Sequence, residues 1–312
     1  LWCERRGFRL SGANRKQVIL PKGITLVPNP IGSAVGFSVL HNDCHIICTP
    51  GVPIELKQMW QQEILPHLIT QLPKVDKVKT VKLHTFGMGE SAIQNLFDQH
   101  LADWPKDIEV GYRAASPLVD LKLTTRSEQA EKHLPEWQAK IESLLGAHVL
   151  KVSTIDSTTA EILEQPFTVA QTLVELLRQK EQTITMAESC TGGLIASNVT
   201  RIPGSSAVFE AGYVTYSNRI KTELLQVKTE TLERHGAVSE AVVLEMAQGA
   251  LDTSGSDWAV SVSGIAGPGG GSDDKPVGTV WICWGNNDRL KTQCLVYPTN
   301  RLNFQRFIAN VG

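Results

Sequence analysis

Between residues 168 and 300, strand-like runs alternate with helix-like runs, and this alternation restricts the fold more than any other feature of the chain. The strand-like runs are 183–187, 209–217, 257–267, 277–286 and 290–297. Apolar residues at helical spacing occupy 190–201 and 241–254, after an earlier helix that starts near Thr168. Alternating helices and strands predict an α/β layered domain. The last two runs can pair antiparallel, so we expect a mixed sheet.

Two further segments precede this domain. Residues 1–75 combine short strands, Gly/Pro turns and one amphipathic helix, which is an α/β pattern. Residues 76–156 combine period-2 strands with two amphipathic helices, which predicts a small α+β module. We place the C-terminal domain at 165–312. Both ends of the sequence read as incomplete helices, which suggests a fragment of a longer protein.

The composition is typical of a soluble globular chain and excludes several classes of protein. Of 312 residues, 42% are hydrophobic and 20% are charged, and the formal net charge is -2. This balance gives no strongly basic surface for nucleic acid or anionic membranes. No apolar run approaches the ~20 residues of a membrane span, and we find no signal-peptide pattern. The 6 cysteines are scattered, so we predict a reducing, cytoplasmic location.

The stretch 186–201, MAESCTGGLIASNVTR, places Ser189, Thr191, Gly192 and Gly193 where a strand gives way to a helix. Backbone N–H groups at a helix start are unpaired, so a nucleophile there lies beside donors for an oxyanion. The simpler alternative is that Ser189 is an N-cap and that the glycines allow close packing. For an isolated serine the simpler alternative is the commoner one. Cys190 is a second candidate nucleophile.

A serine nucleophile needs a base, and Tyr216 and Lys221 follow the next strand-like run. A lysine in a desolvating pocket has a lowered pKa and can deprotonate serine, while tyrosine can relay or donate a proton. Each residue taken alone is more often a surface lysine or a half-buried strand tyrosine.

A glycine-rich loop follows the strand-like run that ends at Ser263 and Gly264. It contains Gly267 and three further glycines at 269–271. Glycines let backbone amides approach a ligand, and α/β sheets bind ligands at the carboxyl ends of their strands. The spacing matches neither the Rossmann fingerprint nor the P-loop, and a floppy loop is the alternative.

Four motifs in order, AESCTGG, GYVTYSNRIK, HGAVSE and SGIAGPGGGSDDKPVGTVW, resemble the C-terminal domain of the CinA family of competence/damage-inducible proteins. The resemblance covers about residues 165–300. It implies a metal-free nicotinamide-nucleotide amidohydrolase (PncC), an NMN deamidase of the pyridine nucleotide cycle in NAD metabolism. Ser189 would be the nucleophile, with Lys221 as base and Tyr216 assisting, and the resemblance favours Ser189 over Cys190. The implied reaction converts nicotinamide mononucleotide (NMN) to nicotinic acid mononucleotide and ammonia.

The resemblance also suggests how the substrate is held. Amides of Thr191 to Gly193, or of the glycine loop, would stabilise the oxyanion, and Glu188 would either orient Lys221 or cap the turn. The substrate-binding residues that we expect are Glu188, Thr191, Gly192, Gly193, Ser263, Gly264, Gly267 and Arg301. The family's Gly-Asp-Arg before the last helix is replaced here by Thr299, Asn300 and Arg301. Arg301 thus remains as a phosphate contact, but the acidic residue beside it is missing.

Residues 14–37 and 49–59 resemble the later half of the molybdopterin-binding-like (MoCF) domain at the front of longer CinA proteins, and 76–156 resemble the KH-type module that follows it. The resemblance associates a complete MoCF-like domain with metal-dependent ADP-ribose pyrophosphatase activity. The characteristic Gly-Gly-Leu-Gly-Pro-Thr-x-Asp-Asp stretch is absent. We therefore expect a truncated MoCF-like domain, and we expect pyrophosphatase activity and a divalent metal only in a full-length parent.

Two other patterns bear on partners and metals. The cluster of His41, Cys44, His45 and Cys48 resembles a zinc site, but a strand would direct His45 away from both cysteines, so we expect no metal. The KH-type module has no GXXG loop with basic flanks, so we expect that no nucleic acid is required and that the module is a structural or dimerisation element. We expect a homodimer acting on a small-molecule substrate away from membranes. A non-enzymatic adaptor is the remaining alternative, and it predicts a damaged Ser–Tyr–Lys set.

Overall fold

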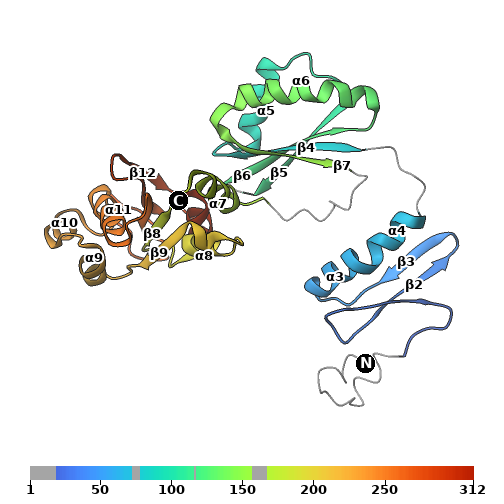
Figure 1. The fold of residues 1–312 in the computed structure, drawn as a ribbon, viewed down its shortest axis with the longest axis horizontal. Helices are drawn as coiled ribbons and strands as arrows, with labels where there is room; N and C mark the ends of the chain where they lie inside the picture. Colours follow the sequence, from blue (N-terminus) through green and yellow to red (C-terminus); the bar gives the residue numbers. More distant parts are fainter. Residues whose placement is uncertain (1–18, 72–77, 116, 157–166) are drawn as a thin grey trace. The chain divides into compact units, whose positions relative to one another are not determined.

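The computed structural model describes residues 19–71, 78–115, 117–156 and 167–312. These residues form two compact units, one of residues 19–71 and one that begins at Val78 (Figure 1). The second unit contains two sheets, one within residues 78–156 and one after residue 167. In the ranges that the structure describes, no helix is both long and apolar enough to cross a membrane.

The first unit is a three-stranded antiparallel sheet followed by a helical arm. Strands β1 (Thr25–Val27), β2 (Gly36–His41) and β3 (Cys44–Cys48) pair in sequence order. Helices α3 (Pro53–Met59) and α4 (Leu65–Gln71) are joined by the π-helical turn Trp60–Ile64. The buried core contains Val27, Met59 and Ile64, whereas Leu40 and Ile54 are 68% and 66% exposed. Among residues 19–71, the buried core is therefore small.

The module of residues 78–156 is a four-stranded antiparallel sheet with both helices on one face (Figure 1). Its strands β4 (Lys79–Phe86), β5 (Ile108–Ala115), β6 (Leu118–Thr125) and β7 (Val149–Asp156) lie in the order β5-β6-β4-β7. Every second residue of β6 is buried, which matches the period-2 pattern of its sequence. These residues pack with helices α5 (Glu90–His100) and α6 (Glu128–Leu145).

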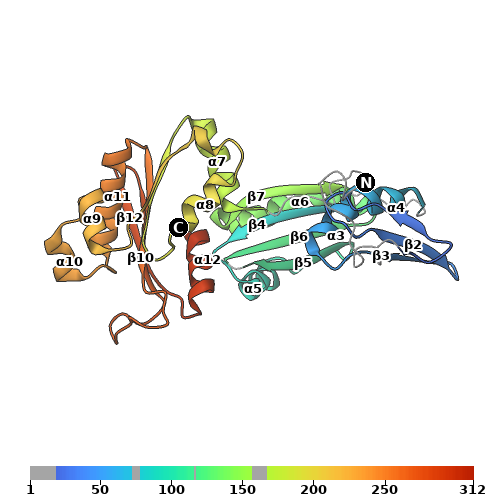
Figure 2. The same cartoon turned by 90° about the horizontal axis from the view of Figure 1, so that it is seen from below.

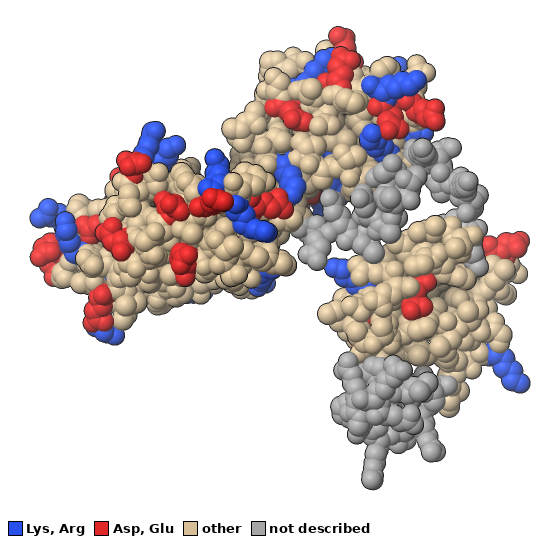
Figure 3. Space-filling view, in the orientation of Figure 1, with Lys and Arg blue, Asp and Glu red and all other residues tan. Residues whose placement is uncertain are grey.

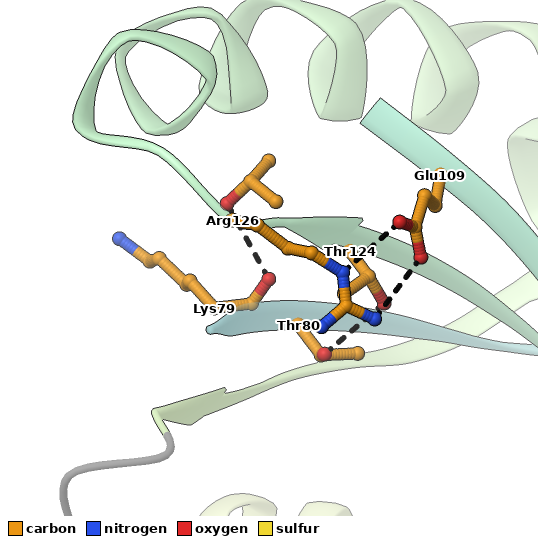
Figure 4. A network of polar contacts seen from close by, with 6 residues as sticks. Lys79, Thr80, Glu109, Thr124 and Arg126 are labelled. Carbon is orange, nitrogen blue, oxygen red and sulfur yellow. Dashed lines mark hydrogen bonds and ion pairs between the residues drawn. The ribbon is translucent and has the colours of Figure 1, made fainter. Parts of the chain in front are cut away.

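Polar contacts tie the end of this sheet together (Figure 4). Arg126 donates from Nε to Glu109 at 3.0 Å, and the hydroxyls of Thr80 and Thr124 hydrogen-bond across two strands at 3.2 Å. These groups are at least partly exposed to water, so each contact adds little to stability. These polar contacts therefore lie at an end of the sheet that is exposed to water.

The C-terminal sheet has five strands in the order β12-β11-β10-β8-β9. Its elements are α7 (Val169–Lys180), β8 (Ile184–Glu188), α8 (Leu194–Thr200), β9 (Phe209–Val214), α9 (Asn218–Leu225), α10 (Thr229–His235), α11 (Glu240–Ser254), β10 (Trp258–Gly264), β11 (Thr279–Gly285), β12 (Leu290–Val296) and α12 (Arg301–Val311). Strands β9, β8 and β10 are parallel, and β11 and β12 are antiparallel to their neighbours. The predicted α/β layered domain with a mixed sheet is confirmed.

Helices cover both faces of this sheet (Figure 2). Residues of α7, α8 and α12 form one core with Met186 of β8, and residues of α9, α10 and α11 form another with Ala187 of the same strand. All five residues of β8 are buried, as expected for a parallel strand between two helical layers.

Charged side chains of both signs are interspersed on the face shown in Figure 3. On this face, the mixture of signs agrees with the small net charge of -2.

Candidate active site

The carboxyl ends of three parallel strands meet at one edge of the C-terminal sheet, where α/β sheets bind ligands. Ser189 directly follows β8, Tyr216 follows β9, and Ser263 and Gly264 end β10. A cavity of about 200 Å³ lies there. Its lining residues are Ser189, Cys190, Tyr216, Lys221, Ala237, Val238, Ser263, Gly264, Ala266 and Arg301.

The central contact of the cavity joins Lys221 and Ser189. Lys221 lies on α9 and is fully buried, and its Nζ is 3.1 Å from Ser189 Oγ. Nζ also donates to the carbonyl of Thr215 at 2.6 Å. Burial disfavours the ammonium form and lowers the pKa of Lys221 from 10.5 to about 8. A sizeable fraction of this amine is therefore neutral near physiological pH and can accept a proton from the serine.

The turn after β8 differs from the expected helix start. Helix α8 begins at Leu194 instead of residue 190, because Gly192 and Gly193 adopt left-handed φ values of 64° and 95°. Gly193 is the N-cap residue, so Ser189 is not a capping serine. Ser189 as a residue is 8% exposed, and its hydroxyl faces Lys221 instead.

Glu188 supplies the cap of α8 from the preceding strand. Its carboxylate is buried and accepts the N–H groups of Gly193 at 3.0 Å, Ile195 at 3.1 Å and Ala196 at 2.8 Å. A carboxylate at a helix start is stabilised by these unpaired donors. Of the two roles that the sequence left open, the contacts favour capping. The Glu188 carboxylate and the Gly193 amide are bonded to each other, and their contact with a substrate stays a prediction.

The backbone donors beside Ser189 also differ from those expected. The N–H of Gly192 donates to the carbonyl of Ser189 at 3.2 Å. Within the described contacts, the N–H groups of Cys190 and Thr191 have no acceptor. Of the predicted amides at Thr191 to Gly193, Thr191 therefore remains available, and Cys190 adds a donor that the sequence did not suggest.

Cys190 is a poor alternative nucleophile. Its side chain is 4% exposed, and burial raises the pKa of the thiol from 9.0 to about 12. The reactive thiolate is therefore scarce near neutral pH. Its carbonyl accepts the amide of Gln305 at 2.8 Å, which ties the turn to α12.

Arg301 joins two predicted site residues at the rim of the cavity. One terminal nitrogen donates to the hydroxyl of Tyr216 at 2.7 Å, and the other donates to the carbonyl of Gly267 at 3.0 Å. Asn300 stands where the family has an aspartate, and its side chain caps α12 by accepting the N–H of Asn303. Aspartate and asparagine are both favourable N-cap residues, so this capping does not need the acid. Tyr216 and Gly267 thus orient Arg301 without a carboxylate.

Ser263 and Gly264 shape the cavity from β10. The hydroxyl of Ser263 is buried and donates to the carbonyl of Ala237 at 2.7 Å. A Cβ at position 264 would lie 2.9 Å from the carbonyl oxygen of Thr279, so glycine is required for close strand packing. The hydroxyl of Ser263 is therefore bonded within the protein, while the residue lines the cavity, and its contact with a substrate stays a prediction.

A Ser–His–Asp arrangement lies outside this cavity, in the module of residues 78–156. His84 bonds through Nδ1 to Asp120 at 2.7 Å and through Nε2 to Ser153 at 3.0 Å. This order resembles a catalytic triad. The His84 side chain is 4% exposed, and its ring stacks on that of Phe167 with ring centroids 4.3 Å apart. We therefore interpret these contacts as buried hydrogen bonds that join β4 to its neighbouring strands β6 and β7.

Models of two known protein domains match the C-terminal domain and the module of residues 78–156. The CinA C-terminal domain model matches residues 166–312, and the damage-inducible protein CinA KH domain model matches residues 80–150. A CinA-like protein of Colwellia psychrerythraea is 47% identical over 311 residues, which are 100% of this chain and 70% of that relative. The chain belongs to the CinA family. This confirms the resemblance carried by the four C-terminal motifs.

Further members of the CinA family extend the comparison. A CinA-like protein of Akkermansia muciniphila is 39% identical, covering 99% of this chain and 71% of the relative. The solved competence/damage inducible protein CihA of Agrobacterium tumefaciens is 42% identical and covers 46% of this chain and 87% of its own, with a TM-score of 0.45.

Proposed function

We propose that this CinA-family chain hydrolyses the carboxamide of nicotinamide mononucleotide without a metal, with Ser189 as nucleophile and Lys221 as general base. The observation that carries the proposal is the 3.1 Å contact between Lys221 Nζ and Ser189 Oγ in a buried site. The pKa of about 8 favours a lysine that exchanges protons near neutral pH. The family resemblance suggests the substrate.

The proposed acylation uses the Ser–Lys pair directly. Neutral Lys221 accepts the Ser189 hydroxyl proton while Oγ attacks the carboxamide carbon. The oxyanion is stabilised by the N–H groups of Cys190 and Thr191, which directly follow the nucleophile. The C–N bond then breaks, and Lys221 returns the proton to the leaving ammonia. A water molecule that gives its proton to the same amine hydrolyses the nicotinoyl ester and regenerates Ser189.

Arg301 is the proposed phosphate contact at the rim. Tyr216 and Gly267 hold the guanidinium in place, and its remaining N–H donors are available for a phosphate. Tyr216 lines the cavity, and we propose that its hydroxyl, which accepts from Arg301, relays protons at the serine.

The test is ammonia release from nicotinamide mononucleotide in EDTA. We expect the full chain to be active and Ser189→Ala to lose activity by at least about a thousandfold. Ser197→Ala, at a half-buried serine on α8, is the matched control and should stay active. A folded chain that releases no ammonia, or a Ser189→Ala protein that remains active, would contradict the proposal.

A further inference from the structure

The connection between α10 and α11 forms one side of the Ser189 cavity. Ala237 and Val238 lie in this connection and line the cavity. The connection leaves α10 at Gly236, which has a left-handed φ of 71°, and enters α11 at Ser239, its N-cap residue. The shape of this side of the cavity therefore depends on how a few peptide groups are oriented.

Four consecutive carbonyls of this segment, at residues 235–238, each accept a hydrogen bond from a side chain. Lys275 Nζ donates to the carbonyls of His235 and Val238, both at 2.8 Å. The hydroxyl of Ser263 donates to the carbonyl of Ala237 at 2.7 Å, and that of Ser239 donates to the carbonyl of Gly236 at 2.9 Å. Because a peptide group is planar, fixing each carbonyl also fixes the N–H of the next residue.

Lys275 reaches this segment from the glycine-rich loop. Its carbonyl accepts the N–H of Ser272 at 2.9 Å, and its own N–H donates to the Ser272 hydroxyl at 3.2 Å, so two hydrogen bonds join Lys275 to Ser272. The base of the loop is closed where the N–H of Ile265 donates to Thr279 and its carbonyl accepts from Gly278, each at 2.8 Å. The side chain of Lys275 therefore connects a folded loop, not a floppy one, to the α10–α11 connection.

We propose that Lys275 is a positioning residue of the deamidase site, which holds the α10–α11 connection so that the cavity fits the nucleotide. This inference deepens the proposed function and rests on it. Lys275 is outside the cavity lining and acts through Val238 and its neighbour Ala237. Ser189 and Lys221 are held by separate contacts, so the effect falls on substrate binding and not on the chemical step.

The test compares three substitutions of Lys275 with a matched control. Lys275→Met removes both donors, Lys275→Gln keeps an uncharged donor, and Lys275→Arg keeps charged donors. Lys291→Met removes an exposed lysine of β12 and serves as the control. Steady-state kinetics with nicotinamide mononucleotide separate KM from kcat. Limited digestion with elastase, which cleaves after small residues such as Ala and Val, reports on the 236–239 segment without requiring activity.

We expect Lys275→Met to raise KM about tenfold or more, with kcat within about threefold, because two hydrogen bonds from a charged donor are lost. Lys275→Gln should be intermediate, Lys275→Arg close to the parent chain, and Lys291→Met unchanged. Elastase should cleave within 236–239 faster in Lys275→Met than in the control.

Three results would overturn the proposal. The first is an unchanged KM and an unchanged digestion of Lys275→Met in an active, folded protein. The second is a fall in kcat at constant KM, which would place Lys275 in the chemical step. The third is a KM of Lys275→Gln equal to that of Lys275→Met, together with a parent KM that salt raises toward this mutant value, which would indicate attraction of the substrate's charge. A parent chain that is inactive on the nucleotide would refute the proposed function. The digestion alone would then test whether Lys275 holds the α10–α11 connection.

Discussion

The buried ammonium of Lys221 makes activity dependent on pH at the level of a single residue. General-base catalysis requires the neutral amine, and its pKa is lowered to about 8. We therefore expect kcat/KM for nicotinamide mononucleotide to rise with pH through about 8 and then level off. Lys221→Arg keeps a charge that does not titrate and should lose at least about a thousandfold in kcat/KM. Lys291→Arg is the control, and a flat pH profile would contradict the assignment of Lys221 as base.

A substitution of Glu188 can distinguish a role in capping α8 from a role in catalysis. In Glu188→Gln an amide nitrogen would replace an oxygen that accepts backbone N–H groups, so one donor would lose its partner. We expect the free energy of unfolding to fall by about 1–3 kcal/mol, measured by urea denaturation. The kcat of the folded protein should stay within about tenfold of the parent value. Glu210→Gln on the exposed side of β9 is the control, and a folded Glu188→Gln protein without activity would show that capping is not its main role.

The sequence predicted the side chains at the site better than the backbone around them. Ser189 and Lys221 were recognised from their motifs, and the structure brings them within hydrogen-bonding distance. The free amide of Cys190 and the capping by Glu188 were missed or left open. Both depend on the left-handed conformations of Gly192 and Gly193, and glycine is compatible with several conformations, so its identity does not specify one.

At the level of elements, the packing of α9 against α11 positions Lys221. A Cβ at Gly249 would overlap the carbonyl oxygen of Leu225, so the two helices can approach closely only with glycine there. We expect Gly249→Ala to destabilise the protein by about 2 kcal/mol or more despite its better helix propensity, and to lower activity by displacing α9. Thermal unfolding and deamidation rates measure both effects. Glu233→Ala, at an exposed position of α10, should leave both unchanged, and a stabilised Gly249→Ala protein would contradict the close approach.

Helix α9 itself shows where element prediction fails. It has eight residues, of which Lys221 and Leu225 are buried, so its apolar periodicity is too short to identify. The sequence therefore suggested no helix at Lys221, although Ser217 is a typical capping residue. By contrast, α11 and β10 were predicted because each presents a long apolar pattern.

At the level of the whole molecule, the sequence predicted the layers of the C-terminal sheet but not its complete strand order. The pairing of β11 with β12 follows from their proximity in sequence, and the alternation of helices and strands favours the layered architecture. The central place of β8, between β9 and β10, depends on contacts across long sequence separations. Such contacts are set by the burial of β8 between two helical layers, which local patterns do not encode.

The buried lysine also affects the stability of the whole fold. Lys221 has a pKa of about 8 in the folded state and 10.5 as its ordinary value, so between these limits the unfolded state binds more protons. The free energy of unfolding should therefore rise with pH in this range, whereas Lys221→Met lacks this titration. We expect the stability advantage of Lys221→Met over the parent to fall by about 2 kcal/mol between about pH 7 and pH 9.5.

This difference can be measured by urea unfolding of the two proteins at each pH, following exposure of Cys283, which is fully buried in the C-terminal sheet. Comparing the proteins at equal pH cancels the titration of the other groups to the extent that the substitution leaves them unperturbed. Lys291→Met removes an exposed ammonium and should show no such pH-dependent change. A constant difference between the parent and Lys221→Met would mean that Lys221 keeps its ordinary pKa in the folded protein, and Ser189 would then lack a base near neutral pH.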